Sequence, residues 1–265
     1  MNKLALVTLA AAGAFIASPS FAATQIISNI SGLPVPAGTT WGVLPGENSG
    51  TVAITTAAPR SGNASLELTG DRTRVQTGVQ YAPATNMGLV SQVQSLIFDW
   101  QVAADSARLT YTPALRLLVQ DGAQRSELIW EGVYNAGTNG FANTNPAGAW
   151  YSTTSSDVFW QYVAGIGPNE TGPGNSLVLK SIADWVSTYS SSAFVAGLSV
   201  GAGSGALPGY HAFVDNVTFT TATGSTTYNF DTAAVPEPAT WGMMIGGLAL
   251  VGASMRRRKM AVSFA

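Results

Sequence analysis

The feature that most constrains the fold is a pair of alternating segments joined by a tight-turn dipeptide near the middle of the chain. Residues 115–120 and 126–134 mix apolar with polar side chains in alternation, and Asp121-Gly122 lies between them. An Asp-Gly pair in this setting favours a type I′ turn, which joins neighbouring antiparallel strands. The sequence therefore predicts a β-hairpin here, and with it an antiparallel sheet.

Short segments of the same kind recur along the chain, separated by Gly, Pro, Ser and Asn. In one of them Leu96, Phe98 and Trp100 share one parity while polar residues occupy the other, which is typical of a half-buried strand. The other predicted strands cover residues 24–30, 51–56, 64–68, 75–81, 158–163, 194–200, 212–220 and 226–230. Regular short strands without a βαβ pattern predict an all-β fold, an antiparallel β-sandwich.

One helix and one long loop interrupt these strands. Residues 182–189 place apolar side chains on one helical face, and Ser181 with Asp184 forms a capping pattern. Residues 135–150 are rich in Gly, Asn and Ala and show no period. We expect a short helix over the sandwich and a long surface loop, and such loops often carry binding residues.

The first 22 residues have the order of a secretory signal peptide. Lys3 supplies the positive charge, residues 4–17 are almost entirely apolar, and small residues precede a cleavage position between Ala22 and Ala23. The sequence therefore predicts a signal helix, export through the Sec translocon and removal of residues 1–22 by signal peptidase.

The tail at residues 235–265 combines three different segments. It opens with Val235, Pro236, Glu237 and Pro238, whose prolines favour an extended and accessible backbone. The run from Trp241 to Met255 has 15 uncharged residues, which as a helix span roughly 22 Å against a hydrocarbon core of about 30 Å. This short hydrophobic helix is followed by a basic group that the positive-inside rule keeps cytoplasmic: Arg256, Arg257, Arg258 and Lys259.

This order of segments resembles the PEP-CTERM protein-sorting signal in its PEPxxWA variant. The matching residues are Pro236-Glu237-Pro238, Trp241, Met243-Met244 and the basic group, with Gly242 where the variant has Ala. The resemblance implies that an exosortase-type protease removes the tail after transient contact with the inner membrane. It also implies a protein at the cell surface or outside the cell, in a system linked to exopolysaccharide.

Residues 23–234 remain as one β-sandwich domain, long enough to form a single core. They hold seven basic and thirteen acidic residues, a net charge of −6, and no run of basic side chains. Such a domain offers no electrostatic footprint for nucleic acid or anionic membranes. The chain has no cysteine, so an exported domain must rely on its core instead of disulfides.

The end of this domain resembles jelly-roll domains of the carbohydrate-binding-module and lectin type, over residues 197–205 and 213–219. The resemblance implies a jelly-roll-like sandwich and makes polysaccharide a candidate partner. Trp150 and Tyr151, at the end of the long loop, are the candidate pair for stacking on a sugar. Trp100 and Trp185 fall on apolar faces and are expected in the core.

Glu127 and Glu131 would face the same way on a strand, with Ile129 between them. The spacing is similar to the Glu-x-Asp-x-Glu signature of laminarinase-type glycoside hydrolases, but Ile129 replaces the central Asp. Four strand residues separate the Cα atoms by about 13 Å, whereas retaining hydrolysis needs carboxyls about 5 Å apart. We expect two solvated glutamates and no enzymatic activity, with glycoside hydrolysis as the remote alternative.

Asp215 shares its parity with Phe213, Val217 and Phe219, so an acid interrupts an apolar face. Such a carboxylate either caps loop amides, the interpretation we favour, or serves as a calcium ligand. No other cofactor is expected. His211 is the single histidine of a chain without cysteine, which argues against a zinc site. The chain has no Gly-x-Ser-x-Gly elbow, a strand-to-helix turn that would present a catalytic serine to it, so we expect His211 at a strand edge or in a loop.

These patterns together predict a non-enzymatic, exported protein of the cell surface or extracellular matrix, associated with exopolysaccharide. A carbohydrate-binding module is the alternative. It would need exposed aromatic side chains on a concave sheet face or at the Trp150 loop.

Overall fold

The computed structural model describes residues 22–32, 40–44, 50–79, 85–135, 145–232 and 238–256. The chain forms two units, Met1–Asp231 and Thr232–Ala265. The first unit contains the strands, and the division between the units lies close to the predicted boundary at residue 234.

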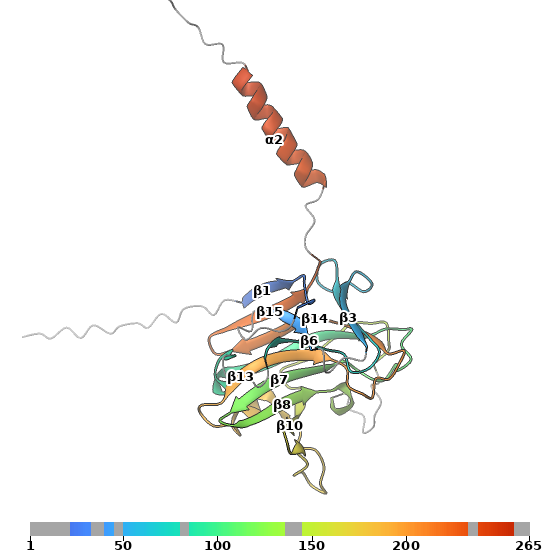
Figure 1. The fold of residues 1–265 in the computed structure, drawn as a ribbon, viewed down its shortest axis with the longest axis vertical. Helices are drawn as coiled ribbons and strands as arrows, with labels where there is room; N and C mark the ends of the chain where they lie inside the picture. The colour runs from blue at the N-terminus through green and yellow to red at the C-terminus, as the bar shows by residue number, and fades with distance from the viewer. Residues whose placement is uncertain are drawn as a thin grey trace, which may run out of the picture. The chain divides into compact units, whose positions relative to one another are not determined.

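The strands of the first unit form two layers (Figure 1). Sheet A has seven strands within the described residues: β1 (Ala22–Ile27), β3 (Thr51–Thr55), β4 (Ser65–Thr69), β6 (Val93–Val102), β9 (Tyr151–Ser152), β14 (His211–Thr221) and β15 (Gly224–Phe230). Sheet B has eight in the same part of the chain: β2 (Trp41–Val43), β5 (Arg74–Gly78), β7 (Ala114–Asp121), β8 (Gln124–Trp130), β10 (Val158–Val163), β11 (Gly167–Pro168), β12 (Lys180–Ser181) and β13 (Phe194–Gly201).

The predicted all-β, two-sheet architecture is therefore confirmed, with one exception in strand direction. Where the structure describes the strands, every pair is antiparallel except β1 with β15, which is parallel. The four strands missed by the sequence patterns, β2, β9, β11 and β12, have only two or three residues each. Segments this short contain too few residues to show alternation.

The central hairpin has a different turn from the one predicted. Asp121 pairs with Gln124, so the two-residue loop is Gly122-Ala123. Gly122 has a φ of +56° while Ala123 is not among the described residues with positive φ, which is the pattern of a type II′ turn. Asp121 belongs to the strand, where its carboxylate accepts hydrogen bonds from the backbone N–H and the hydroxyl of Ser190.

Strand β14 joins most of sheet A because three strands pair with it. One of its edges pairs with β6, and the other pairs first with β4 over residues 211–214 and then with β15 over residues 217–221. A β-bulge with Asn216 at a φ of +49° lies at this branch point. A bulge adds one residue to a strand and so reverses the order of its faces. Ala212 and Val214 reach the core before it and Val217 and Phe219 after it.

Aromatic side chains from both sheets meet in the core between the layers. Phe98 of β6 lies 5.1 Å from Trp130 of β8 between ring centroids, and Trp41 of β2 lies 5.1 Å from Phe230 of β15. Trp100 and Trp185 are buried as predicted. Burial of such aromatic residues is the main source of stability in a chain without disulfides.

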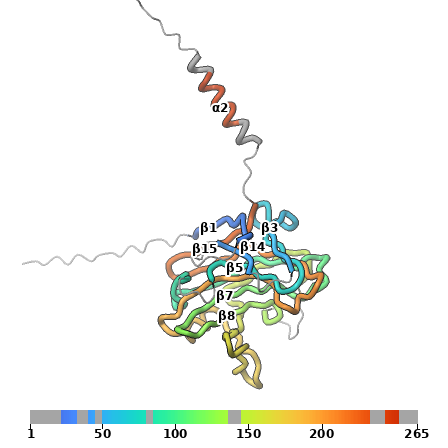
Figure 2. The backbone as a smooth tube through the Cα atoms, in the orientation of Figure 1, coloured from blue at the N-terminus to red at the C-terminus, as the bar shows by residue number. Residues whose placement is uncertain are grey.

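The predicted helix is present as α1 (Ile182–Val186), and its cap is as expected, because the Ser181 hydroxyl accepts from the Asp184 N–H. Ile182 and Trp185 are buried, and the Trp185 indole donates to the Phe159 carbonyl at 2.8 Å. Between β10 and α1, the yellow part of the chain projects from the sandwich (Figure 2).

The second unit contains α2 (Pro238–Arg256), which confirms a helix in the tail. The helix begins three residues before the expected start at Trp241, with Pro238 in the first position, where the missing proline N–H costs nothing. Within the described residues, no helix combines the length and the apolar character needed to cross a membrane.

Candidate functional site

Of the cavities lined by described residues, one lies on the face of sheet B that points away from the core. Side chains alternate along each strand of this sheet. On β8, Leu128 and Trp130 pack into the core, while Glu127 and Ile129 point to the opposite side. On β10, Phe159 is in the core and Trp160 is on that opposite side.

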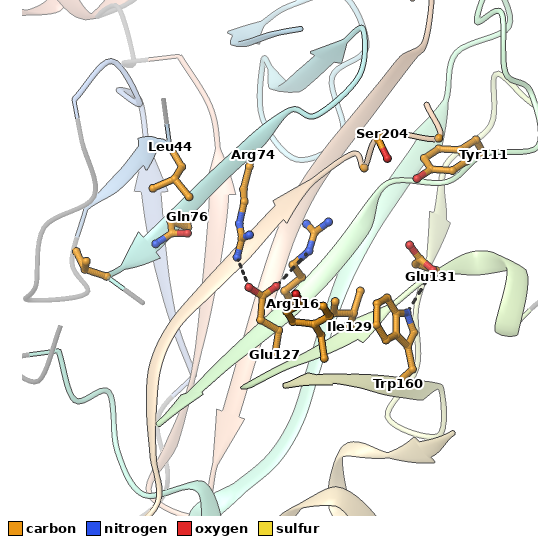
Figure 3. A pocket seen from close by; sticks show the side chains of 14 residues that line it. Leu44, Arg74, Gln76, Tyr111, Arg116, Glu127, Ile129, Glu131, Trp160 and Ser204 are labelled. Atoms are coloured by element: carbon orange, nitrogen blue, oxygen red, sulfur yellow. Dashed lines mark hydrogen bonds and ion pairs between the residues drawn. The ribbon is translucent and has the colours of Figure 1, made fainter. Parts of the chain in front are cut away.

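These outward side chains line a cavity of about 590 Å³, which we call the sheet B pocket (Figure 3). Strands β5, β7, β8 and β10 form its floor, and the segment after β13 contributes three small residues. The lining residues are Leu44, Arg74, Gln76, Val79, Tyr111, Arg116, Glu127, Ile129, Glu131, Trp160, Tyr162, Gly203, Ser204 and Gly205.

Glu127 is the centre of an ion-pair cluster at the base of this pocket. Its Oε1 accepts from Arg74 Nη2 at 3.0 Å, and its Oε2 lies 3.7 Å from Arg116 Nε. Figure 3 shows both guanidinium groups converging on the carboxylate. Only 7 % of Glu127 is exposed. The prediction of a solvated glutamate is therefore wrong, because two arginines, one from β7 and one from β5, supply the charge that its burial requires.

Glu131 lies in the same pocket but just beyond the end of its strand. β8 ends at Trp130, four residues before the predicted end, because the Gly132 N–H bonds to Thr112 and the chain turns into a 3₁₀ helix, Gly132–Tyr134. Glu131 is still extended, and its Oε2 accepts from the Trp160 indole at 3.3 Å. Burial raises the pKa of Glu131, while the charge of Arg116 acts in the opposite direction. This glutamate is also not freely solvated.

Two buried polar atoms in the pocket lack a hydrogen-bond partner among the residues that the structure describes. They are Arg116 Nη1 and Gln76 Oε1, one a donor and the other an acceptor. Burial and the neighbouring charge of Arg74 lower the pKa of Arg116, and Glu127 offsets this in part. Unsatisfied buried groups are rare in native proteins, and a ligand with hydroxyl or anionic groups would satisfy them.

Aromatic rings form the outer wall of the pocket. Trp160 and Tyr111 are half-buried, and Tyr162 is 38 % exposed. The sequence patterns missed this set, although the alternation of residues 158–163 already places Trp160 and Tyr162 on the face opposite Phe159. Tyr111 comes from a loop, and only the fold brings it to the same place.

The predicted stacking pair, Trp150 and Tyr151, lies elsewhere. The Tyr151 ring packs 5.1 Å from Trp100, and its hydroxyl donates to the Pro146 carbonyl. The Arg60 guanidinium lies 5.9 Å from the centroid of the Trp150 ring. Tyr151 borders a smaller cavity of about 160 Å³, together with Trp130 and other residues. Their role in glycan contact stays a prediction.

Asp215 lies at the branch point of β14 and is fully buried. Its Oδ2 accepts from the Ser61 N–H at 3.0 Å and its Oδ1 from the Phe230 N–H at 2.9 Å, so the carboxylate caps amides from two segments. The bulge at Asn216 puts Asp215 on a different face from Val217 and Phe219, so the predicted shared face is wrong for these two residues and holds only for Phe213, which precedes the bulge. Burial raises the pKa of Asp215 to about 6, while these amides lower it.

Asp99 lies beside Asp215 and completes what we call the branch cluster. The Asp99 Oδ2 accepts from Arg60 Nε and from Asn216 Nδ2, each at 2.9 Å, and its Oδ1 accepts from the Ser152 hydroxyl. The residues that the structure describes include no group of three or more His, Cys, Asp or Glu placed to hold a metal ion.

His211 is the first residue of β14, so its predicted place at a strand edge is confirmed. Its Nδ1 lies 2.7 Å from Asp105 Oδ1, and its Nε2 lies 2.8 Å from Glu67 Oε1. Two carboxylates thus hold the ring.

The sequence signals at both ends fall largely outside the described residues. Ala22 and Ala23 begin β1, whereas residues 1–21 are not described. Val235, Pro236 and Glu237 of the motif, and Arg257, Arg258 and Lys259 of the basic group, are also outside. Pro238, Trp241 and Arg256 belong to α2.

A comparison with family models found the PEP-CTERM protein-sorting motif at residues 234–259. This match agrees with the resemblance carried by Pro236-Glu237-Pro238, Trp241 and the basic group, and it implies export through an exosortase system. No curated protein and no solved structure matched the chain. The jelly-roll resemblance of the sandwich therefore stays a prediction.

Proposed function

We propose that this exported protein binds polysaccharide at the cell surface or in the extracellular matrix, through the sheet B pocket and without chemical conversion. The sorting motif supports the location. Two cleavages would release residues 23–234 as the mature domain. Signal peptidase would cut between Ala22 and Ala23, and an exosortase-type protease would remove the tail. Sec translocon, signal peptidase and exosortase are its transient partners.

The observation that carries this proposal is the combination of stacking rings and hydrogen-bonding groups in one open cavity. Sugar rings present apolar faces to aromatic side chains and hydroxyl groups to polar ones, so a glycan site needs both kinds. Trp160 and Tyr162 supply the first. The unpartnered Gln76 Oε1 and Arg116 Nη1 supply an acceptor and a donor.

The size of the pocket also suits a saccharide. A cavity of about 590 Å³ falls within the range of about 300–1,000 Å³ that is usual for small-ligand sites. Its floor consists of strands, which hold side chains more rigidly than loops do. Preorganised side chains reduce the entropy lost on binding.

The test is a glycan array probed with the mature protein recovered from cell-surface and medium fractions. The intact mass of this sample shows whether residues 1–22 and the tail from residue 235 have been removed. We expect binding to at least one polysaccharide, and about fivefold to tenfold weaker binding by Trp160→Ala, because a ring-stacking contact contributes about 0.5–1.5 kcal/mol beyond the area it buries.

Trp150→Ala is the matched control, since it removes the same type of side chain outside the pocket. Loss of binding in Trp150→Ala alone would move the site to the Trp150 loop. No binding to any glycan by a folded wild-type protein would overturn the proposed function. A mass that retains residues 256–259 in the membrane fraction would contradict processing by an exosortase.

Glycoside hydrolysis is a second candidate, because Glu127 and Glu131 line the same cavity. Their spacing of about 13 Å between Cα atoms and the two arginines on Glu127 argue against it. The same sample decides the matter. Release of reducing ends from a bound glycan would show that the protein is a hydrolase and would overturn the proposal that it only binds.

A further inference from the structure

A second hollow of about 240 Å³ adjoins the sheet B pocket, and we call it the arginine hollow. The two share Arg74, Arg116, Gly203 and Ser204 in their walls. The lining residues of the hollow are Arg72, Thr73, Arg74, Arg116, Ala202, Gly203 and Ser204. A ligand that fills the pocket can therefore extend into the hollow.

The arginine hollow concentrates positive charge in an otherwise acidic domain. Residues 23–234 carry only seven basic side chains, and three of them line this one hollow. No acidic residue is among its described lining residues. The sequence shows no basic run here because Arg72 lies just before β5, Arg74 begins β5 and Arg116 comes from β7, with β13 between these strands.

Among the described residues, Arg116 interacts with two acids that also have other partners. Glu127 pairs with both Arg74 and Arg116, at 3.0 and 3.7 Å. Glu131 is the second acid, and its Oε2 also accepts from the Trp160 indole at 3.3 Å. Arg116 Nη1 is buried and has no acceptor in the described part of the chain, so this donor is open to a ligand where the two cavities meet.

We infer that the ligand of the sheet B pocket is an acidic glycan, whose carboxylate, sulfate or phosphate group enters the arginine hollow. The inference rests on the proposed function, since it names the class of polysaccharide bound at that site. The sugar ring lies against Trp160 and Tyr162, and the anionic group accepts hydrogen bonds from Arg116 Nη1 and Arg72. Guanidinium groups match such anions in shape as well as charge.

The domain's net charge of −6 limits where an anionic ligand can bind. An anionic polymer is repelled at long range by the acidic surface, so its binding must come from the local cluster. Added NaCl screens this long-range repulsion more strongly than the contacts inside the half-buried hollow, so moderate salt should not abolish binding of the acidic glycan.

The test measures affinity for matched probes: an oligogalacturonate, its methyl-esterified form, and sulfated, phosphorylated and unmodified glucan oligosaccharides. Arg72→Asn is the diagnostic variant. Arg72 is exposed and has a φ of +51°, a conformation that Asn also adopts readily, so the change removes the charge without strain. Arg108→Asn is the control, an equal loss of charge at an exposed residue outside both cavities.

We expect at least one acidic probe to bind at least tenfold more tightly than its neutral counterpart. Arg72→Asn should lose about tenfold for that probe and leave neutral glycans unchanged, whereas Arg108→Asn should match the wild type. The acidic probe that binds identifies the anion as carboxylate, sulfate or phosphate.

Equal affinity for charged and neutral probes, with no effect of Arg72→Asn, would overturn the inference. If Trp160→Ala still weakened that binding, the proposed function would stand. Failure of every acidic probe to bind would also overturn the inference, and the glycan array would then decide the proposed function separately.

Discussion

The branch cluster of sheet A and the Glu127 cluster of sheet B both bury charged side chains, but they satisfy them to different degrees. In the branch cluster, both oxygens of Asp215 accept backbone amides, and Asp99 receives Arg60, Asn216 and Ser152. In the sheet B cluster, Arg116 Nη1 and nearby Gln76 Oε1 have no partner in the described part of the chain, and the group borders two cavities.

This difference separates two uses of buried charge. A saturated cluster adds to the stability and specificity of a fold, since each polar atom finds its partner within the chain. A cluster that leaves hydrogen-bonding atoms unsatisfied beside a cavity lowers the stability of the fold by the desolvation penalty of those atoms. A ligand that bonds to them can offset this penalty. The comparison therefore assigns the branch cluster to folding and the Glu127 cluster to binding.

Asp215→Ala should give the largest loss of stability in this comparison. It leaves the N–H groups of Ser61 and Phe230 without their acceptor where β14 changes partners. We expect the free energy of unfolding, measured with urea, to fall by about 3 kcal/mol. Glu170→Ala, at an exposed acid, is the control and should change stability by less than about 0.5 kcal/mol.

A loss below about 1 kcal/mol in Asp215→Ala would show that the branch point does not depend on this carboxylate. The folded fraction of the variant should still bind glycan as the wild type does, because Asp215 lines neither cavity.

The next largest effect is a dependence of the free energy of unfolding on pH, caused by the titration of Asp215. Its pKa is about 6 in the folded chain against 3.8 ordinarily, so the folded state retains a proton that the unfolded state loses. The resulting stability is complete below pH 4 and falls as the pH rises through 6, by about 2 kcal/mol between pH 4 and 7.

Asp215→Asn cannot titrate and should lack this component. Urea unfolding of both proteins at pH 4, 5.5 and 7 measures it as the difference between the two curves. If the free energy of unfolding changed with pH by the same amount in both proteins, burial would not raise the pKa of Asp215. Other acids contribute equally to both proteins and cancel in the comparison.

Arg116→Met should give the smallest change in stability. The variant keeps the 3.0 Å pair between Arg74 and Glu127 and removes the unpartnered Nη1. The change removes one of the two cations beside Glu127, but Arg74 still pairs with it, so we expect a loss of about 1 kcal/mol in urea unfolding, smaller than in Asp215→Ala. Glycan affinity should nevertheless fall at least tenfold.

The opposite pattern in Arg116→Met, a loss near 3 kcal/mol with unchanged glycan affinity, would remove the distinction between the two clusters. The Glu127 cluster would then be structural, like the branch cluster.

The sequence determined the parts of this protein that depend on local order. Alternation and turn residues placed most strands within a few residues, and the Ser181 cap located α1. The tail was identified from Pro236-Glu237-Pro238, Trp241 and the basic group alone, because a sorting signal acts as a contiguous segment.

Only the tertiary structure decided the site and the exceptions to the pattern. The bulge at Asn216 reversed a face of β14, and strand pairing brought Arg74 and Arg116 to Glu127 and placed Arg72 in the same hollow as these two arginines. The physical reason is that alternation records which side of a strand a residue takes, whereas pairing order records which strands are neighbours. Charges more than forty residues apart in sequence became one cluster only when β5, β13, β7 and β8 formed a sheet.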